Sequence, residues 1–77
     1  MENHYNCIYM YTNKINGKGY VGKAEDFLRR KKQHIKSSYN KKANGYNVPF
    51  HRAIRKYGIE NFDATILKEN LTKDEMN

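Results

Sequence analysis

Two short segments near the amino terminus are rich in residues that favour β-structure. The first segment covers residues 7–13 and the second covers residues 19–23, with Asn16-Gly17 between them. An Asn-Gly pair is typical of a type I′ hairpin turn, because both central positions of that turn need a positive φ. The pattern therefore predicts a β-hairpin with Asn16 and Gly17 as its two loop residues.

The predicted hairpin brings three tyrosines together. With a two-residue loop, Tyr11 pairs with Gly22, and side chains alternate between the two faces along each strand. Tyr9, Tyr11 and Tyr20 then share one face, with open space beside Gly22. The other face carries Ile8, Met10 and Val21.

Two helices are predicted after the hairpin. Residues 25–38 begin with acidic residues and continue with basic ones, as the helix dipole favours. Phe27, Arg30 and His34 are spaced three and four apart in this segment, so they share a helix face. A polar loop at residues 37–47 then leads to the second helix.

The second helix has recognisable ends. Pro49 suits its first turn, and Gly58 suits the position just past its last turn. Between them, one apolar stripe follows the spacing i, i+3, i+4, i+7 and is formed by Phe50, Ala53, Ile54 and Tyr57.

A third strand is predicted at residues 62–67, where Phe62, Ala64 and Ile66 alternate with other residues. The fold class is therefore α/β (α+β), a small three-stranded antiparallel sheet flanked by helices in the order β-β-α-α-β. Residues 72–75 have the spacing of a capping box, which predicts the start of a further helix. So short a helix is unstable by itself in water, and we expect the polypeptide to be part of a longer one.

The bulk composition indicates a single small globular domain spanning residues 1–77. Hydrophobic residues make up 38% of the chain and charged residues 30%, and no apolar run reaches the roughly 20 residues that span a bilayer. Cys7 is the only cysteine, which excludes an internal disulfide and a multi-cysteine zinc site. With no recognisable secretory signal, an intracellular (cytoplasmic) protein is the simplest interpretation.

The charge distribution predicts a polyanionic partner. Fifteen Lys and Arg against eight Asp and Glu give a net charge of +7, concentrated in the middle of the chain. Nucleic acid is the commonest partner for such a surface, and the alternative is a basic surface that serves solubility. The positions expected to follow the nucleic-acid backbone are Lys23, Lys31, Lys32, Lys36, Lys41, Lys42, Arg52 and Arg55.

These features together resemble the GIY-YIG nuclease family. The first signature tripeptide appears as Cys7-Ile8-Tyr9 and the second as Tyr20-Val21-Gly22. Residues 26–34, with Arg30 and His34, resemble the helix that carries the family's catalytic arginine, and the resemblance extends over residues 7–69. It implies a DNA endonuclease of the homing-endonuclease type, and the abundance of Asn, Lys, Tyr and Ile suggests an AT-rich genome such as that of a phage or mobile element.

Two departures from the family pattern bear on activity. Cys7 stands where the first signature has a glycine, and its thiol either packs as a small apolar group or crowds the site. The family's metal-binding glutamate lies on the helix after the third strand, and Glu69 and Glu75 come too early to match it. We therefore expect that ligand beyond Asn77, and we expect these 77 residues to be inactive alone.

The resemblance also implies a mechanism. One divalent ion, Mg²⁺ or Mn²⁺, would assist hydrolysis of a phosphodiester bond, with Tyr9 as the base for the attacking water. Arg30 would hold the scissile phosphate, and Tyr20 would position the phosphate or the water. His34 would either orient Tyr9 or donate to the phosphate. His4 and His51 have no evident partners in the sequence and are assigned no role.

Ionising a free phenol at pH 7 costs about 4 kcal/mol, so the mechanism needs nearby cations. Lys14, Lys18, Lys23 and Arg30 are the candidates. Two other functions fit the charge: a noncatalytic nucleic-acid-binding module on the same fold, and a scaffold for acidic protein surfaces. Nothing in the chain resembles a base-reading helix, so sequence specificity is expected from a separate carboxyl-terminal DNA-binding domain. The oligomeric state is left open.

Overall fold

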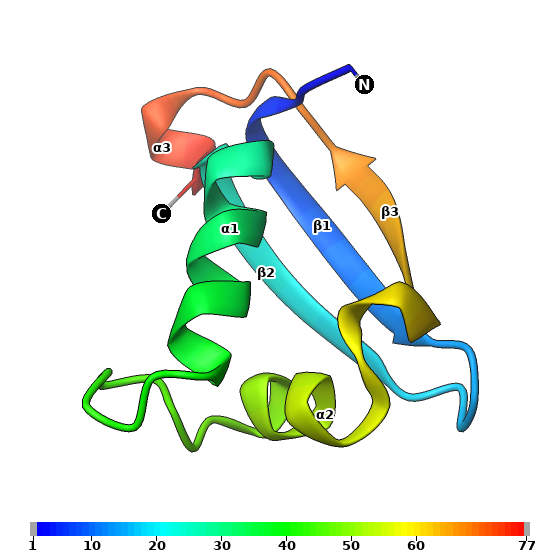
Figure 1. Ribbon diagram of the computed structural model, residues 1–77. Helices are drawn as coiled ribbons and strands as arrows, with labels where there is room; N and C mark the ends of the chain where they lie inside the picture. The colour runs from blue at the N-terminus through cyan, green and yellow to red at the C-terminus, as the bar shows by residue number, and fades with distance from the viewer. Residues whose placement is uncertain (1, 77) are drawn as a thin grey trace.

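The structure is a computed structural model that describes residues 2–76. Its centre is a three-stranded antiparallel sheet in the order β2-β1-β3, so that β1 is the middle strand (Figure 1). The strands are β1 Tyr5–Asn13, β2 Gly19–Asp26 and β3 Phe62–Lys68. The helices are α1 Phe27–Ser38, α2 Pro49–Tyr57, the 3-10 turn η1 Ile59–Asn61 and α3 Lys73–Met76. The predicted fold class and element order are confirmed.

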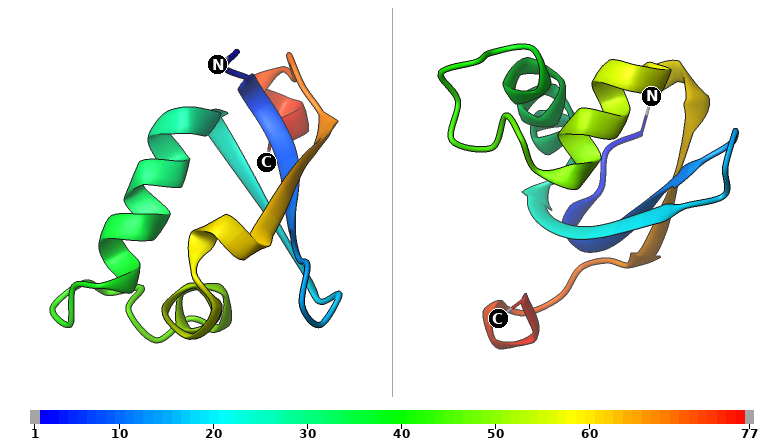
Figure 2. Two further views of the ribbon diagram at one scale, coloured as in Figure 1. Left: turned by 45° about the vertical axis from the view of Figure 1, so that its right-hand side comes forward. Right: turned by 90° about the horizontal axis from the view of Figure 1, so that it is seen from below.

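The sheet has helices on both sides, but its two faces are covered unequally. Figure 2 shows α1 and α2 together on one face, with the short α3 on the opposite side. The buried core lies under α1 and α2 and is formed by Cys7, Tyr9, Tyr11, Ala24, Phe27, Phe50, Ala53, Ile54 and Phe62. The middle strand therefore presents its alternate residues to both long helices. None of the helices within residues 2–76 has the length and apolar content needed to cross a bilayer.

The hairpin forms, but its predicted register is wrong by two residues. Tyr11 pairs with Tyr20, and Tyr9 pairs with Gly22. The turn is longer than two residues because Asn13 N–H donates to Lys18 O at 2.9 Å. Gly17 has a φ of 76°, whereas Asn16 is not among the residues with positive φ, so the turn is not type I′.

The side chain of Asn13 gives a physical reason for the longer turn. Its Oδ1 accepts the N–H of Ile15 at 2.8 Å, and Gly17 N–H donates to Asn13 O at 2.7 Å. These bonds close a turn of residues 14–17 without the positive φ that Asn16 would need. A slip of two residues does not exchange the faces of a strand, so the three tyrosines still share one face, as predicted.

The first helix begins two residues later than predicted. Residues 25 and 26 continue β2, where Asp26 pairs with Tyr5. Asp26 is the N-cap residue, and its Oδ1 accepts the N–H of Arg29 at 3.1 Å and the Nδ2–H of Asn3 at 2.7 Å. The cap holds the end of β2 and the start of α1 in fixed relation.

The later elements form as predicted. Pro49 opens α2, and Gly58 ends it with a φ of 85°. In the capping box, Thr72 N–H donates to Glu75 Oε1 at 2.9 Å and Glu75 N–H donates to Thr72 Oγ1 at 3.2 Å. The loop of residues 39–48 joins α1 to α2, and its last residue, Val48, lines a cavity beside Tyr9.

Candidate active site

All four predicted catalytic residues line one open cavity of about 390 Å³. Tyr9 comes from β1, Tyr20 from β2, and Arg30 and His34 from α1. The cavity is completed by Val21, Gly22, Lys23, Val48, Pro49 and Phe50. The sheet register, the start of α1 and the position of α2 together place two phenols, a guanidinium and an imidazole around one space.

Tyr9 is buried in the middle strand, and its ring lies across Gly22. A Cβ atom at position 22 would come within 2.6 Å of Tyr9 Cζ and 2.9 Å of Cε1. The space expected beside Gly22 is therefore filled by the ring of Tyr9. A glycine at this point of β2 is what lets the phenol reach the cavity.

A chain of short hydrogen bonds runs from Tyr9 through two imidazoles. Tyr9 Oη lies 2.7 Å from His34 Nε2, and His34 Nδ1 lies 2.7 Å from His51 Nε2. His51 Nδ1 lies 2.6 Å from the carbonyl oxygen of Gly45, which is the last member of this series of hydrogen bonds. The expectation that His51 has no partner is wrong, because α2 turns this buried side chain toward α1. His51 lies three residues before Ile54, and this helical spacing could have indicated from the sequence that its side chain is buried. The apolar stripe alone does not include it.

Burial shifts the proton equilibria of these groups. Burial raises the pKa of Tyr9 above its usual value, although hydrogen bonding and the positive charge of Arg30 oppose the rise. Burial, followed by the charges of Arg30 and His51, lowers the pKa of His34 to about 4. At neutral pH the phenol is therefore protonated and His34 is neutral, and the tautomer of His34 decides which of the two groups donates.

Arg30 and Tyr20 occupy the more open side of the cavity. Arg30 is exposed and lines the cavity, and its Nη1–H donates to Gln33 Oε1 at 3.3 Å. Tyr20 is half-buried, with its ring centroid 5.2 Å from that of Phe50. The core therefore holds the Tyr20 ring, whereas the Arg30 guanidinium is accessible to a ligand.

Most of the expected cations lie away from Tyr9. Lys14 forms a 3.9 Å ion pair with Asp63, and Lys18 lies over the ring of Tyr20 at 5.8 Å. Lys23 lines the cavity, and its Nζ–H donates to the carbonyl oxygen of Met76. Arg30 is the cation whose charge and hydrogen bond lower the pKa of Tyr9. Burial outweighs both, so the pKa of Tyr9 is raised overall.

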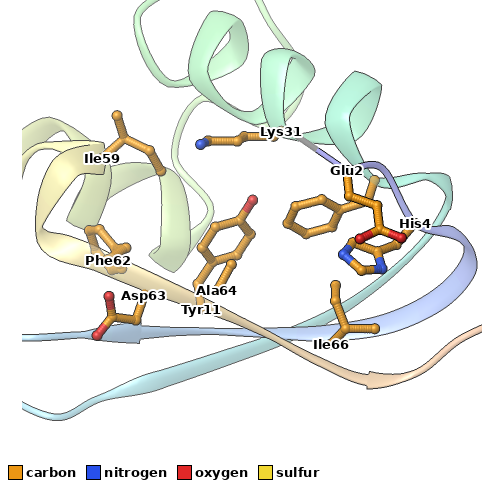
Figure 3. A pocket seen from close by; sticks show the side chains of 10 residues that line it. Glu2, His4, Tyr11, Lys31, Ile59, Phe62, Asp63, Ala64 and Ile66 are labelled. Atoms are coloured by element: carbon orange, nitrogen blue, oxygen red, sulfur yellow. The ribbon is translucent and has the colours of Figure 1, made fainter.

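The predicted DNA-contact residues fall into three groups. Lys31 lies on the other side of the core, in a second cavity of about 290 Å³ that Tyr11 also lines (Figure 3). Arg55 donates to the carbonyl oxygens of Ser38, at 2.9 Å, and Tyr46. The remaining exposed ones are Lys23, Lys32, Lys36, Lys41, Lys42 and Arg52. The DNA contacts of all these residues stay predictions.

Arg55 therefore has a structural role that the sequence does not reveal. Its guanidinium carbon also lies 3.8 Å from the centroid of the Tyr46 ring. These partners come from the loop of residues 39–48 and from the end of α1. A spacing rule cannot identify them, because loop carbonyls carry no sequence signature.

Cys7 lies in the core at 0% exposure, on the same face of β1 as Tyr9. Burial, with a smaller contribution from Glu69, raises the pKa of its thiol, so Cys7 stays uncharged at neutral pH. The cysteine at this signature position thus packs as a small apolar group.

The resemblance implies a divalent ion, and the described residues do not by themselves fit one. Within residues 2–76, no three His, Cys, Asp or Glu side chains come together in a way that could hold a metal.

Comparison with known proteins shows the class of this chain. A model of the GIY-YIG catalytic domain matches residues 5–77, and the chain belongs to that family. It is 39% identical over 71 residues to a putative endonuclease, segE, of Enterobacteria phage T4, and 36% identical over 55 residues to a probable intron-encoded endonuclease 1 of Neurospora crassa. These matches cover 92% and 71% of this chain.

The structural comparison agrees with the sequence comparisons. The catalytic domain of intron endonuclease I-TevI, solved as a mutant, matches with a TM-score of 0.70 and 32% identity. This match covers 90% of the present chain and 68% of that domain. By contrast, the chain spans 30% of the length of the phage relative and 16% of the length of the fungal one.

Proposed function

We propose that this chain is the catalytic domain of a metal-dependent DNA endonuclease that hydrolyses phosphodiester bonds. The observation that carries the proposal is the arrangement of Tyr9, Tyr20, Arg30 and His34 around one open cavity. Family membership and the two endonuclease relatives support the reaction class. The net charge of +7 supports DNA as the substrate.

Tyr9 acts as the base through His34. A phenol whose pKa is raised by burial does not lose its proton in advance at neutral pH. Tyr9 instead takes a proton from the attacking water while its own hydroxyl proton passes to His34 Nε2, 2.7 Å away. The water oxygen forms its bond to phosphorus as the bond to the leaving oxygen breaks, and the leaving oxygen takes a proton from solvent.

Arg30 holds the scissile phosphate. Its exposed guanidinium offers parallel N–H donors on the open side of the cavity, and a planar fork matches two phosphate oxygens. Its charge also offsets the negative charge that develops on the phosphate in the transition state. The Tyr20 hydroxyl, on a ring held against Phe50, positions the phosphate or the water.

The proposal also includes a divalent metal ion and a separate DNA-binding domain. A divalent ion, Mg²⁺ or Mn²⁺, would supply charge stabilisation when bound, and we infer that its glutamate ligand follows Asn77. For that reason we expect these 77 residues to bind DNA without cutting it. The small share of the curated relatives that the chain covers is consistent with a separate carboxyl-terminal DNA-binding domain.

The test is nicking of supercoiled plasmid in the presence of Mg²⁺ or Mn²⁺. The 77-residue chain is compared with a longer form of the protein that includes these residues, each with and without EDTA. We expect both to bind DNA, and we expect the longer form alone to cut, in an EDTA-sensitive manner. A longer form that binds DNA but never nicks it with either ion would favour the noncatalytic binding module.

A further inference from the structure

We propose that His51 is a positioning residue that sets the tautomer of His34, so that His34 Nε2 is free to accept the proton of Tyr9. The proposal rests on the proposed function and assigns a role to a residue outside the catalytic set. It is carried by the unbroken chain of hydrogen bonds between Tyr9 and the carbonyl of Gly45.

With His51 in its neutral form, the direction of every hydrogen bond in this series follows from its last member, the carbonyl of Gly45. A backbone carbonyl only accepts hydrogen bonds, so His51 Nδ1 must carry the hydrogen that it donates to Gly45 O at 2.6 Å. In a neutral imidazole the other nitrogen is then a bare acceptor. His51 Nε2 therefore accepts from His34 Nδ1–H at 2.7 Å.

The tautomer of His34 in turn determines the direction of its hydrogen bond with Tyr9. Because His34 carries its hydrogen on Nδ1, its Nε2 has a free lone pair, and Tyr9 O–H donates to it at 2.7 Å. The orientation that base catalysis needs is thus present before the substrate arrives. Without an acceptor at His51, His34 would have no partner fixing its hydrogen on Nδ1, and the opposite tautomer would instead donate to Tyr9.

The same series of hydrogen bonds can also satisfy every polar atom after the protons have moved. When Tyr9 O–H breaks and His34 Nε2–H forms, the Nδ1–H of His34 can break as His51 Nε2–H forms. His51 is then an imidazolium that donates to Gly45 O and to His34 Nδ1, and no polar atom loses its partner. The positive charge then lies on His51, the next ring after His34 in the series of hydrogen bonds. The charge of Arg30 opposes protonation of His34.

The fold holds His51 firmly in this place. The residue lies in the first turn of α2 and is 6% exposed, and its ring centroid lies 5.0 Å from that of His34. Gly45 permits the close approach of the ring, because a Cβ there would lie 3.2 Å from His51 Cε1.

The groups that face His34 indicate that a proton leaving it passes to His51. Tyr9 and Tyr11 face it from β1, Arg30 from its own helix and His51 from α2. Burial raises the pKa of Tyr11, so that phenol stays protonated, and Arg30 cannot accept a proton at neutral pH. His51 is the remaining acceptor.

The first experiment reads the tautomers directly and needs no enzymatic activity. Long-range ¹H–¹⁵N NMR spectra of the imidazoles are recorded at neutral pH for the 77-residue chain and for His51→Gln and His51→Phe. Glutamine retains an acceptor near the position of Nε2, whereas phenylalanine fills the space without one. Backbone amide spectra establish that each variant keeps the fold.

We expect His34 to carry its hydrogen on Nδ1 in the parent chain and in His51→Gln. In His51→Phe, we expect a substantial population with the hydrogen on Nε2. A parent chain with the hydrogen of His34 on Nε2, or an unchanged His34 tautomer in folded His51→Phe, would overturn the proposal.

The second experiment measures single-turnover cutting by a form of the protein that cuts DNA. His51→Phe should lower the rate at saturation by about 10- to 100-fold, part of the range for a proton-transfer contribution, while DNA affinity changes by less than about 2-fold. His51→Gln should restore most of the rate. Equal rates for the two variants would show that the tautomer does not serve catalysis. The expected tautomers in a protein that never cuts would overturn the proposed function and leave the assignment of His51 to His34 intact.

Discussion

Tyr9 is held between an acceptor and a cation, and this environment decides what it can do. Its hydroxyl donates to a neutral imidazole, and Arg30 lies beside it, yet burial still raises its pKa. A stable phenolate is therefore disfavoured at neutral pH, contrary to the expectation that a group of cations would supply the ionisation energy. Transfer of the phenol proton to His34 during the reaction removes that requirement.

At the same scale, Arg30 and Arg29 form a matched pair of neighbouring exposed arginines on different faces of α1. Arg30→Ala should lower the cutting rate by at least about 100-fold, because it removes the donors directed at the developing phosphate charge. Arg29→Ala should lower it by less than about 3-fold, because that side chain does not line the cavity. Single-turnover cutting and circular dichroism would measure rate and fold. Equal rates for the two variants would contradict the assignment of the phosphate clamp.

Gly22→Ala tests whether the Tyr9 ring must cross a glycine. The added Cβ would lie 2.6 Å from Tyr9 Cζ, so the ring must move or the strand must shift, at a cost of about 1–3 kcal/mol in unfolding free energy. A displaced phenol should also lower the cutting rate by at least about 10-fold. Gly19→Ala is the control, because its Cβ would meet the flexible Met10 Sδ at 3.1 Å. Urea denaturation and cutting rates would measure both effects, and similar results for the two glycines would refute the steric argument.

At the scale of secondary-structure elements, α2 contributes to the site through residues on two of its faces. The apolar stripe of Phe50, Ala53 and Ile54 packs into the core, and this could be predicted because periodicity records burial. His51 and Arg55 contact α1 and the loop instead. Those contacts depend on where the loop carbonyls of residues 45 and 46 lie, which no local pattern encodes.

The hairpin shows the same limit in another form. The alternation of residues in β1 and β2 predicts which face each tyrosine occupies, and that prediction holds. The pairing partner of each residue depends on the turn, where the side chain of Asn13 competes with the Asn-Gly preference for a type I′ geometry. Faces were therefore predictable from the sequence, whereas the register was not.

Arg55→Met tests the structural role of this arginine at the junction of α1, α2 and the loop. The carbonyl oxygens of Ser38 and Tyr46 would lose their donor, and the unfolding free energy should fall by about 1–3 kcal/mol. Arg52→Met removes an exposed charge on the same helix and should change the unfolding free energy by less than about 0.5 kcal/mol. Urea denaturation would measure stability, and filter binding would measure DNA affinity. Loss of affinity without loss of stability in Arg55→Met would instead favour a direct DNA contact.

At the scale of the whole molecule, His34 lies where the sheet and both long helices meet. It belongs to α1, its Nε2 accepts from β1 and its Nδ1 donates to α2. The site and the fold are therefore coupled through one imidazole, because a proton added to His34 places a charge in the buried region where three elements pack and reverses the hydrogen bond to Tyr9. Catalysis needs the same nitrogen to be free, so one pH range should govern both stability and activity.

The stability of the protein should fall as the pH is lowered from about 6.5 to about 4. The folded pKa of His34 is lowered to about 4 from 6.5, so the unfolded chain binds the proton first and acid favours unfolding across this interval. With allowance for the partial exposure of the ring, the loss should be about 1–3 kcal/mol. Asp26 and Glu75, whose pKa values are lowered from 3.8 and 4.5, lose their contributions as the pH falls below those values, at the acid end of this interval and beyond it.

Urea denaturation at a series of pH values would measure this dependence, with His34→Gln as the matched variant. Glutamine keeps an acceptor for Tyr9 but does not titrate, so the difference between the two stability curves isolates the imidazole. That difference should grow between pH 4 and pH 6.5 and stay constant above it. A flat difference across the interval would mean that His34 is not held neutral by the fold, and the route for the Tyr9 proton would then lack its acceptor.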